Sequence, residues 1–339
     1  TGSGIVGDGI RGFNINQVEM TNVIDGIRIR SLSDANGRLG IIRDNVINGI
    51  GLGSPRGISI EHESGILGLQ VADNTVSGFR GEDANQNGVL DPSEDLNNNG
   101  ILDPGEDIDF DGRLDLSEDL NGNALLDSGF GVYVSAANGS QILANDPLNM
   151  TRPLGILDNT LTGNGSGLSL LATGNSTITA DVRRNTATGS TDVGEDANGN
   201  QVLDPGEDIN GNGILEFGSG FRVFANNSTI NLVTFVDNAA TGGFGNGGTF
   251  QTLNGGAINV VNPNIDPDSL EPALAFTRNT FDNNDLDGLF VRADSGSIIF
   301  DQIQESSFDG NGDDGLDIET DNGGTIFIRD PLLLNTFVG

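Results

Sequence analysis

The chain has 339 residues, of which 49 are acidic and 15 are basic, and its formal net charge is −34. Every basic residue is Arg, there is one His and there is no Cys. This composition excludes Schiff-base lysines, P-loop phosphate binding, cysteine nucleophiles and multi-histidine or thiolate zinc centres. The charge repels phosphates and anionic lipids, so we expect no nucleic-acid partner and no membrane insertion, and hard divalent cations as the natural ligands.

Two short patterns alternate in residues 1–80 and then return along the whole chain. The first is Gly-apolar-x-apolar, with copies at 26–29, 57–60, 167–170, 220–223, 288–291 and 315–318, and looser copies near Gly129 and Gly256. The second is an Asn that precedes short residues, found at Asn22, Asn45, Asn74, Asn159, Asn185, Asn238, Asn279 and Asn335, with Ser307 in the same position.

Where nothing is inserted, the Asn positions lie 23 to 29 residues apart, which suits one coil of a solenoid and is too short for a propeller blade. Alternation of apolar residues inside each copy predicts strands. The sequence therefore predicts an all-β, right-handed parallel β-helix of about 8–9 coils. Equivalent residues in such coils lie about 4.8 Å apart, so the Asn side chains would form a structural ladder of hydrogen-bonded amides.

These repeats resemble the right-handed parallel β-helix repeats of the pectate-lyase-like superfamily, over about 265 of the 339 residues. That superfamily includes polysaccharide lyases, glycoside hydrolases, surface adhesins and phage tailspikes. The resemblance therefore implies the fold, and it does not choose an activity.

Residues 81–128 interrupt the coil spacing with tandem segments that match an EF-hand calcium loop. Such a loop needs oxygen ligands at positions 1, 3, 5, 9 and 12, and a Gly at position 6. Three consecutive segments provide these ligands as Asp83, Asn85, Asn87, Asp91 and Glu94, then Asp95, Asn97, Asn99, Asp103 and Glu106, then Asp107, Asp109, Asp111, Asp115 and Glu118. A fourth, with Asp119, Asn121, Asn123 and Asp127, lacks the carboxylate at position 12, so we expect it to bind weakly.

Coil spacing resumes over 129–191, and residues 192–217 carry a second array. Its first loop is complete except for Gln201 at position 6, and its second lacks the closing carboxylate. The predicted ligands are Asp196, Asn198, Asn200, Asp204 and Glu207, then Asp208, Asn210, Asn212 and Glu216. Both arrays lie between an Asn turn and the next Gly-apolar strand, so we expect them to leave one corner of the solenoid.

The composition of the two arrays predicts binding of several Ca²⁺ ions as cofactors. Together they hold 21 acidic residues and one Arg, which accounts for −20 of the net charge. Without a cation the carboxylates of these segments would repel one another, so we expect metal binding to be coupled to the folding of the segments. There is no room for flanking helices, and the arrays resemble thrombospondin type 3 repeats or dockerin loops. This resemblance implies a stiffening or linking role, with an affinity of about 10⁻⁴ to 10⁻³ M.

Residues 218–339 return to coils and contain the weak candidates for catalysis. Arg292, Asp317 and Glu319 are predicted to lie together on the outer face of one sheet, where the alternative interpretation is an ion pair between coils on a solvated surface. A second acidic group, with Asp282, Asn284 and Asp287 aligned to Asp309, Asn311 and Asp314, is a further candidate for calcium. We expect the single histidine, His62, to lie in an exposed turn.

The sequence as a whole favours an extracellular or cell-surface calcium-binding protein without catalytic activity, with a structural or adhesive role in a surface, matrix or filament. We expect self-association, head-to-tail or through the calcium loops, and polysaccharide as the other partner to consider. The alternative is a polysaccharide lyase, a glycoside hydrolase or a carbohydrate-binding β-helix. Neither end of the sequence shows a capping segment, so we expect either a longer protein or ends covered by neighbouring copies.

Overall fold

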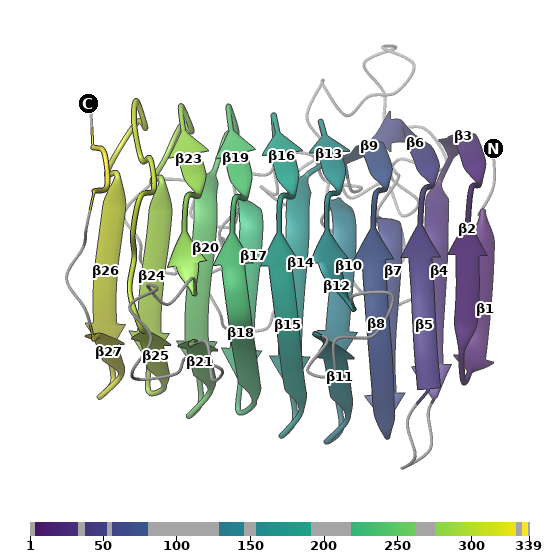
Figure 1. The fold of residues 1–339 in the computed structure, drawn as a ribbon, viewed down its shortest axis with the longest axis horizontal. Helices are drawn as coiled ribbons and strands as arrows, with labels where there is room; N and C mark the ends of the chain where they lie inside the picture. The colour runs from purple at the N-terminus through teal and green to yellow at the C-terminus, as the bar shows by residue number, and fades with distance from the viewer. Residues whose placement is uncertain are drawn as a thin grey trace, which may run out of the picture.

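The computed structural model describes residues 4–32, 38–52, 56–80, 129–145, 154–190, 218–261, 275–329 and 334–337. The regular structure of these residues consists of β-strands in three sheets, and each sheet is parallel throughout (Figure 1). None of the described residues forms a helix long and apolar enough to cross a membrane.

Sheet A has nine strands that pair in chain order. They are β1 (Ile5–Ile10), β4 (Asp25–Leu32), β7 (Arg56–Ser64), β10 (Phe130–Ala136), β14 (Ser166–Thr173), β17 (Ser219–Asn226), β20 (Asn246–Leu253), β24 (Leu289–Asp294) and β26 (Leu316–Asp321). The six regular Gly-apolar-x-apolar copies and the looser copy near Gly129 fall on these strands or start one residue before them. The looser copy near Gly256 was placed wrongly, because the residues after it form a strand of sheet B (Ala257–Val260).

Sheet B has eleven strands and sheet C has seven. Sheet B contains β2 (Phe13–Asn16), β5 (Arg38–Arg43), β8 (Ile66–Ala72), β11 (Gln141–Ala144), β12 (Gly155–Leu157), β15 (Thr177–Arg183), β18 (Thr229–Val236), β21 (Ala257–Val260), β22 (Phe276–Thr277), β25 (Ser297–Phe300) and β27 (Thr325–Ile328). Sheet C contains β3 (Glu19–Val23), β6 (Val46–Leu52), β9 (Thr75–Arg80), β13 (Thr160–Thr162), β16 (Thr186–Thr188), β19 (Ala239–Thr241) and β23 (Thr280–Asp282).

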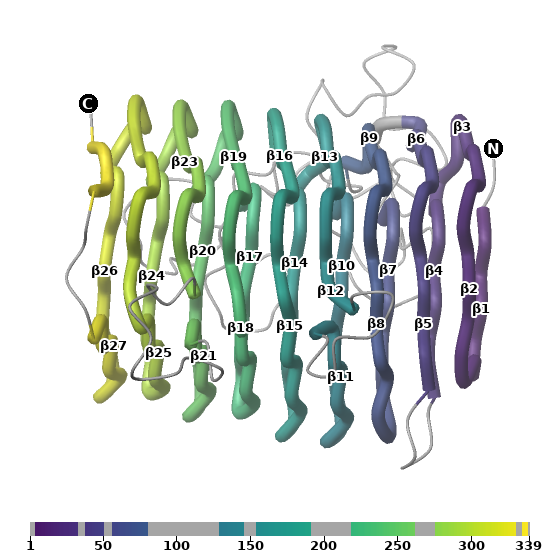
Figure 2. The backbone as a smooth tube through the Cα atoms, in the orientation of Figure 1, coloured from purple at the N-terminus to yellow at the C-terminus, as the bar shows by residue number. Residues whose placement is uncertain are grey.

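The chain passes from sheet A to sheet B to sheet C and then starts the next coil, so the coils stack along one long axis (Figure 2). The two ends of the chain lie at opposite ends of this stack (Figure 1). The protein is therefore an all-β parallel β-helix solenoid, as predicted, and the nine strands of sheet A agree with the expected 8–9 coils.

One continuous apolar core fills the space between the sheets because alternate residues of each strand point inward. Ile58 and Ile60 of β7 are fully buried, and they pair in register with Val132 and Val134 of β10. Toward the C-terminal coils the core becomes aromatic. The rings of Phe276, Phe281, Phe308 and Phe337 stack in sequence, with centroids 6.1, 5.8 and 5.1 Å apart.

The Gly of the repeated pattern is required because neighbouring backbones approach each other closely at that point. A Cβ added to Gly57 would collide with the carbonyl oxygen of Gly131 in the next coil and with the side chain of Val76. The corresponding Cβ on Gly167 would collide with the carbonyl oxygen of Gly220. Residues with a side chain cannot occupy these positions unless the coils move apart.

The Asn positions form the predicted ladder at the turn from sheet B to sheet C. Asn159 illustrates the pattern, because its Oδ1 accepts hydrogen bonds from the backbone N (3.2 Å) and the Nδ2 (2.9 Å) of Asn74. Its own Nδ2 donates to the Oδ1 of Asn185 at 2.8 Å and to the carbonyl of Val71 at 2.9 Å. The same amide-to-amide bond joins Asn45 to Asn74, Asn185 to Asn238, and Asn238 to Asn279.

Two predicted ladder positions were wrong by a few residues. In the first coil the backbone N of Val18, and not Asn22, donates to Asn45. At the other end Asn279 donates from its backbone to the hydroxyl of Ser306, whose own backbone N donates to Asn335. Ser307 instead donates to the carboxylate of Asp282. The ladder positions are set by a two-residue turn, and spacing alone does not locate that turn.

Candidate functional site

The predicted calcium ligands, from Asp83 to Asp127 and from Asp196 to Glu216, lie outside the described residues. The strands on either side show where the two insertions join the solenoid. Segment 81–128 follows β9 of sheet C and precedes β10 of sheet A. Segment 191–217 follows β16 of sheet C and precedes β17 of sheet A. Both therefore connect the same two sheets.

The described residues at the two ends of each insertion contact one turn of the next coil. The backbone N of Gly165 donates to the carbonyl of Phe79 at 2.7 Å, and that of Ser166 donates to the carbonyl of Gly129 at 2.6 Å. At the second insertion, Phe244 N donates to the carbonyl of Ser190 (2.9 Å) and Asn246 N to that of Gly218 (2.9 Å). Each insertion thus starts and ends beside one inter-coil turn, and the stacking continues across it.

The outer face of sheet A carries the side chains in which the sequence suggested chemistry. Successive register partners form one row on this face, and they alternate along their strands with core residues such as Ile58 and Ile60. The row consists of Arg28, Ser59, Tyr133, Ser169, Arg222, Thr249, Phe290 and Asp317. This face is not solvated throughout, since Ser59 is 0 %, Phe224 4 % and Phe290 1 % exposed.

Charged groups on the same face are joined in pairs. Arg56 forms an ion pair with Glu61, and its guanidinium lies 4.7 Å from the centroid of the Tyr133 ring. Burial raises the pKa of Tyr133, with Arg56 opposing that shift. Arg30 holds Glu63 with two bonds of 2.7 and 3.0 Å. The first pair lies within β7, and the second joins β4 to β7 at the surface, so both are structural contacts within or between neighbouring coils.

The weak catalytic candidates come together at the C-terminal end of sheet A. Arg292 and Glu319 are register partners, with 3.9 Å between Nη1 and Oε2, and the Nη2 of Arg292 lies 3.8 Å from Asp321. Burial raises the pKa of Glu319, and the charge of Asp317 raises it further while Arg292 lowers it. The three predicted residues are neighbours, and the group they form is a loose ion-pair network that also includes Asp321.

The second acidic group lies at the corner between sheets C and A in the last coils. The Oδ1 of Asp287 accepts a hydrogen bond from the backbone N of Asp314 at 3.0 Å. Carboxylate oxygens of Asp287, Asp313 and Asp314 all lie within 4.8 Å of one another. Asp287 is 4 % exposed, and burial raises its pKa to about 7 despite the lowering effect of that hydrogen bond. Asn246 occupies this position in the preceding coil and accepts from the backbone N of Asp287.

The prediction of an exposed turn for His62 was wrong. His62 is 1 % exposed, because β7 continues to Ser64 and alternation directs its side chain inward after Ile58 and Ile60. Its Nδ1 lies 3.2 Å from the carbonyl of Ser31, which only accepts, so Nδ1 carries the proton. Nε2 has no hydrogen-bond partner, and burial lowers the pKa of the ring.

Sequence reasoning missed a polar row on the outer face of sheet B, formed by Thr179, Asn231 and Asn259. These residues are register partners, and hydrogen bonds join them across three coils. The sequence does contain a pattern that could have predicted this row, the repeat Ile-Asn-apolar at 230–232 and 258–260. In it an Asn outside the ladder alternates with core residues.

Comparison with protein families, with curated proteins and with solved structures finds no match to this chain. The class of protein is therefore defined by its own geometry. It is an all-β parallel β-helix solenoid with a buried amide ladder at one corner and two acidic insertions that join it at another.

Proposed function

We propose that this protein is an extracellular calcium-binding β-helix of the pectate-lyase-like type, with a structural or adhesive role in a cell surface, matrix or filament. The observation that carries the proposal is the continuity of the solenoid across its insertions. Asn74 and Asn159 are 85 residues apart in the chain, yet their side chains bond at 2.9 Å as adjacent ladder members do. The stacking of the coils therefore does not require the acidic segments, so these segments can have a role of their own.

The donor chemistry of the insertions supports Ca²⁺ as the resident ion. Their predicted ligands offer carboxylate and amide oxygens, and the chain has no Cys and a single, buried His. Oxygen-only donor sets suit Ca²⁺ and are unsuited to Zn²⁺. In this proposal, binding of the ion offsets the repulsion among the carboxylates and orders each segment against the corner of the rod.

We also propose that calcium controls self-association of the rods, head-to-tail or through the insertions. Within sheet A of the described residues, β1 and β26 each have one neighbouring strand. Such strand edges present unpaired backbone groups that can pair with another chain. The charge of −34 opposes association of bare rods, and bound divalent cations would reduce that repulsion.

The test is a calcium titration of the full chain, with circular dichroism and light-scattering mass recorded on the same samples. We expect the β signal to persist in chelator while the mass falls, and the mass to rise again with added calcium. A mass that is the same with calcium and with chelator would contradict the assembly role.

A matched pair of variants separates specific binding from general charge. Glu94→Gln with Glu106→Gln removes two closing carboxylates of the predicted loops. Glu19→Gln with Glu305→Gln removes two exposed carboxylates from the solenoid surface. We expect the first pair to bind fewer calcium ions in calorimetry and the second to bind as the parent does. Equal binding by both would contradict the assignment of the loops.

A further inference from the structure

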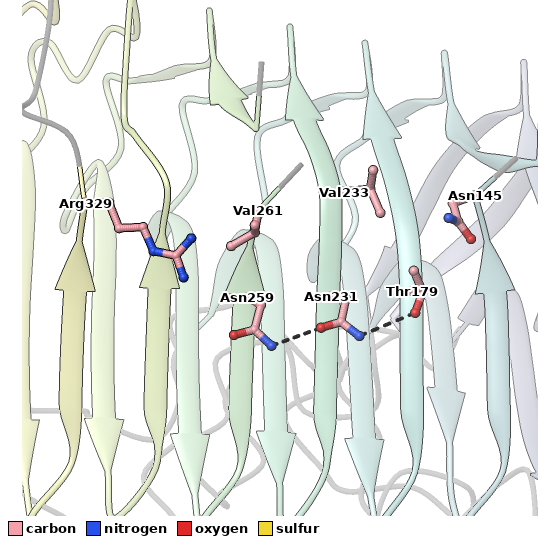
Figure 3. A pocket seen from close by; sticks show the side chains of 7 residues that line it. All are labelled: Asn145, Thr179, Asn231, Val233, Asn259, Val261 and Arg329. Atoms are coloured by element: carbon pink, nitrogen blue, oxygen red, sulfur yellow. Dashed lines mark hydrogen bonds between the residues drawn. The ribbon is translucent and has the colours of Figure 1, made fainter. Parts of the chain in front are cut away.

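A solvent-open groove of about 430 Å³ lies on the outer face of sheet B (Figure 3). Thr179, Asn231 and Asn259 form its floor, Val233 and Val261 lie beside them, and Asn145 and Arg329 complete the lining. Its volume falls within the range of about 300 to 1,000 Å³ that is typical of small-molecule sites.

The topology of sheet B builds this groove. Strands β15 and β18 are continuous, whereas the flanking positions are each divided into two short strands, β11 with β12 and β21 with β22. Strand β11 ends one residue before Asn145, and β21 ends one residue before Val261. The groove therefore lies over β15, β18 and β21, and it includes the residue that follows β11 and the one that follows β21.

A β-bulge adds to the shape of the floor. The pairing of β15 with β18 shifts between Ala180 and Asp181, so Val233 is an extra residue in β18. It belongs to the groove lining and is 8 % exposed, while Leu232 remains in the core. Bulges of this kind redirect side chains and are frequent beside binding sites.

The floor offers hydrogen-bonding groups that both donate and accept. Asn259 donates from Nδ2 to the Oδ1 of Asn231 at 2.9 Å, and Asn231 donates from Nδ2 to the hydroxyl of Thr179 at 3.5 Å (Figure 3). This row leaves the Oδ1 of Asn259 as an acceptor, and a second N–H on each amide as a donor. These groups repeat from coil to coil along the axis.

The groove has no net charge to attract an ion. Its one charged lining residue, Arg329, donates from Nη1 to Asp301 at 2.8 Å, so its charge is compensated. No carboxylate belongs to the lining that the structure describes, which leaves out the pair of acids that glycoside hydrolysis needs. The chain as a whole, at −34, would also repel an acidic polymer.

We infer that this groove binds a neutral saccharide chain. Sugar hydroxyls donate and accept at once, as the amide row does, and the apolar ring faces of the sugar would pack on Val233 and Val261. The row continues along the solenoid axis, so the ligand lies across β15, β18 and β21. The groove binds this ligand and does not cleave it. This assignment is independent of the calcium-dependent role proposed above.

The test uses the full chain in calcium buffer on an array of neutral oligosaccharides built from glucose, mannose, galactose or N-acetylglucosamine, with oligogalacturonate and oligoalginate as acidic members. Calorimetry then measures the affinity of the strongest binder. We expect a neutral oligosaccharide to bind, and Asn231→Ala and Asn259→Ala each to weaken it at least tenfold. Thr179→Val, which removes the hydroxyl and keeps the shape, should also weaken binding.

Asn226→Ala is the matched control, because Asn226 accepts an amide hydrogen bond from Asn254 in the same part of the solenoid and lies outside the groove. It should bind as the parent does, and circular dichroism should show every variant folded. The inference is overturned if no neutral oligosaccharide binds, if only acidic ones bind, or if the folded groove variants keep the parent affinity.

Discussion

Individual amide side chains join one coil to the next in this fold. A ladder Asn such as Asn159 satisfies buried backbone groups of the preceding coil and bonds to the ladder amide of the next coil, so its removal leaves several buried donors and acceptors without partners. A buried polar group without a partner costs about 1 to 3 kcal/mol. The loss of stability on replacing an Asn by Ala should therefore be large at a ladder position and small at an exposed position.

Asn159→Ala is expected to lower the free energy of unfolding by about 3 kcal/mol, because Asn74 loses its acceptor and Val71 its donor. Asn14→Ala, which removes an exposed amide of β2, should change it by less than about 0.5 kcal/mol. Urea denaturation of both variants measures the difference. Equal effects would show that the ladder contributes no special stability.

His62 should make stability depend on pH. Burial lowers its pKa in the folded state, so below about 6.5 the unfolded chain binds a proton that the folded chain does not. The contribution of His62 is thus fully present above pH 6.5 and is lost as the pH falls toward the folded-state pKa. Other groups titrate in the same range, so the comparison must be made between the parent and His62→Gln.

We expect the urea midpoint of the parent to fall more steeply between pH 7.5 and pH 5 than that of His62→Gln. NMR titration of the ring protons gives an independent measurement, since the ring should titrate below its ordinary value. Parallel midpoint curves for the two proteins would show that the buried ring accepts its proton without cost.

At the scale of a strand, the sequence predicted what repeats and missed what depends on local geometry. Alternation located the strands of sheet A and the inward direction of residues such as Ile58 and Ile60. It failed for His62, because two flanking Glu suggested a turn where β7 continues. It also failed for Ser306, because a one-residue shift in a turn leaves the period nearly unchanged. The groove on sheet B depends on interruptions and a bulge that composition does not reveal.

The Gly of the strand pattern gives a sharp prediction at this scale. Gly57→Ala in β7 is expected to cost about 2 kcal/mol, because the new Cβ meets the backbone of Gly131. Gly68→Ala in β8 is the control, since a Cβ there meets its nearest neighbours at ordinary contact distances of 3.4 Å or more. Thermal unfolding compares the two. A destabilised Gly68 variant with an unaffected Gly57 variant would contradict the close-approach explanation.

At the scale of the whole molecule, the solenoid and the predicted calcium arrays are two distinct parts of the chain. The sequence predicted both parts, but only the solenoid lies among the described residues. Hydrogen bonds between coils run from β7 through β10 to β14 without a break. The first insertion therefore adds nothing that this pairing requires.

Deletion of 81–128 should leave a folded rod. Ser77 of β9 is equivalent to Thr241 of β19 by register, so the last three residues of β9 (Gly78, Phe79 and Arg80) and Gly129 would lead into β10 with as many residues as the natural connection 242–245. We expect an unchanged β signal and urea midpoint, with fewer calcium ions bound in calorimetry. Loss of the β signal would show that the insertion helps to hold the coils together.

The turns from sheet B to sheet C are all two residues long, a left-handed residue such as Asp158 at φ 56° followed by the ladder residue. In mechanical terms, a pull along the axis acts on the bonds between coils and would detach the coils one by one. Releasing the 26 residues from Asn159 to Asn185 frees roughly 90 Å of chain. The 85 residues from Asn74 to Asn159 free roughly 290 Å. A coil that carries an insertion would thus release much more chain when it detaches than a coil without one.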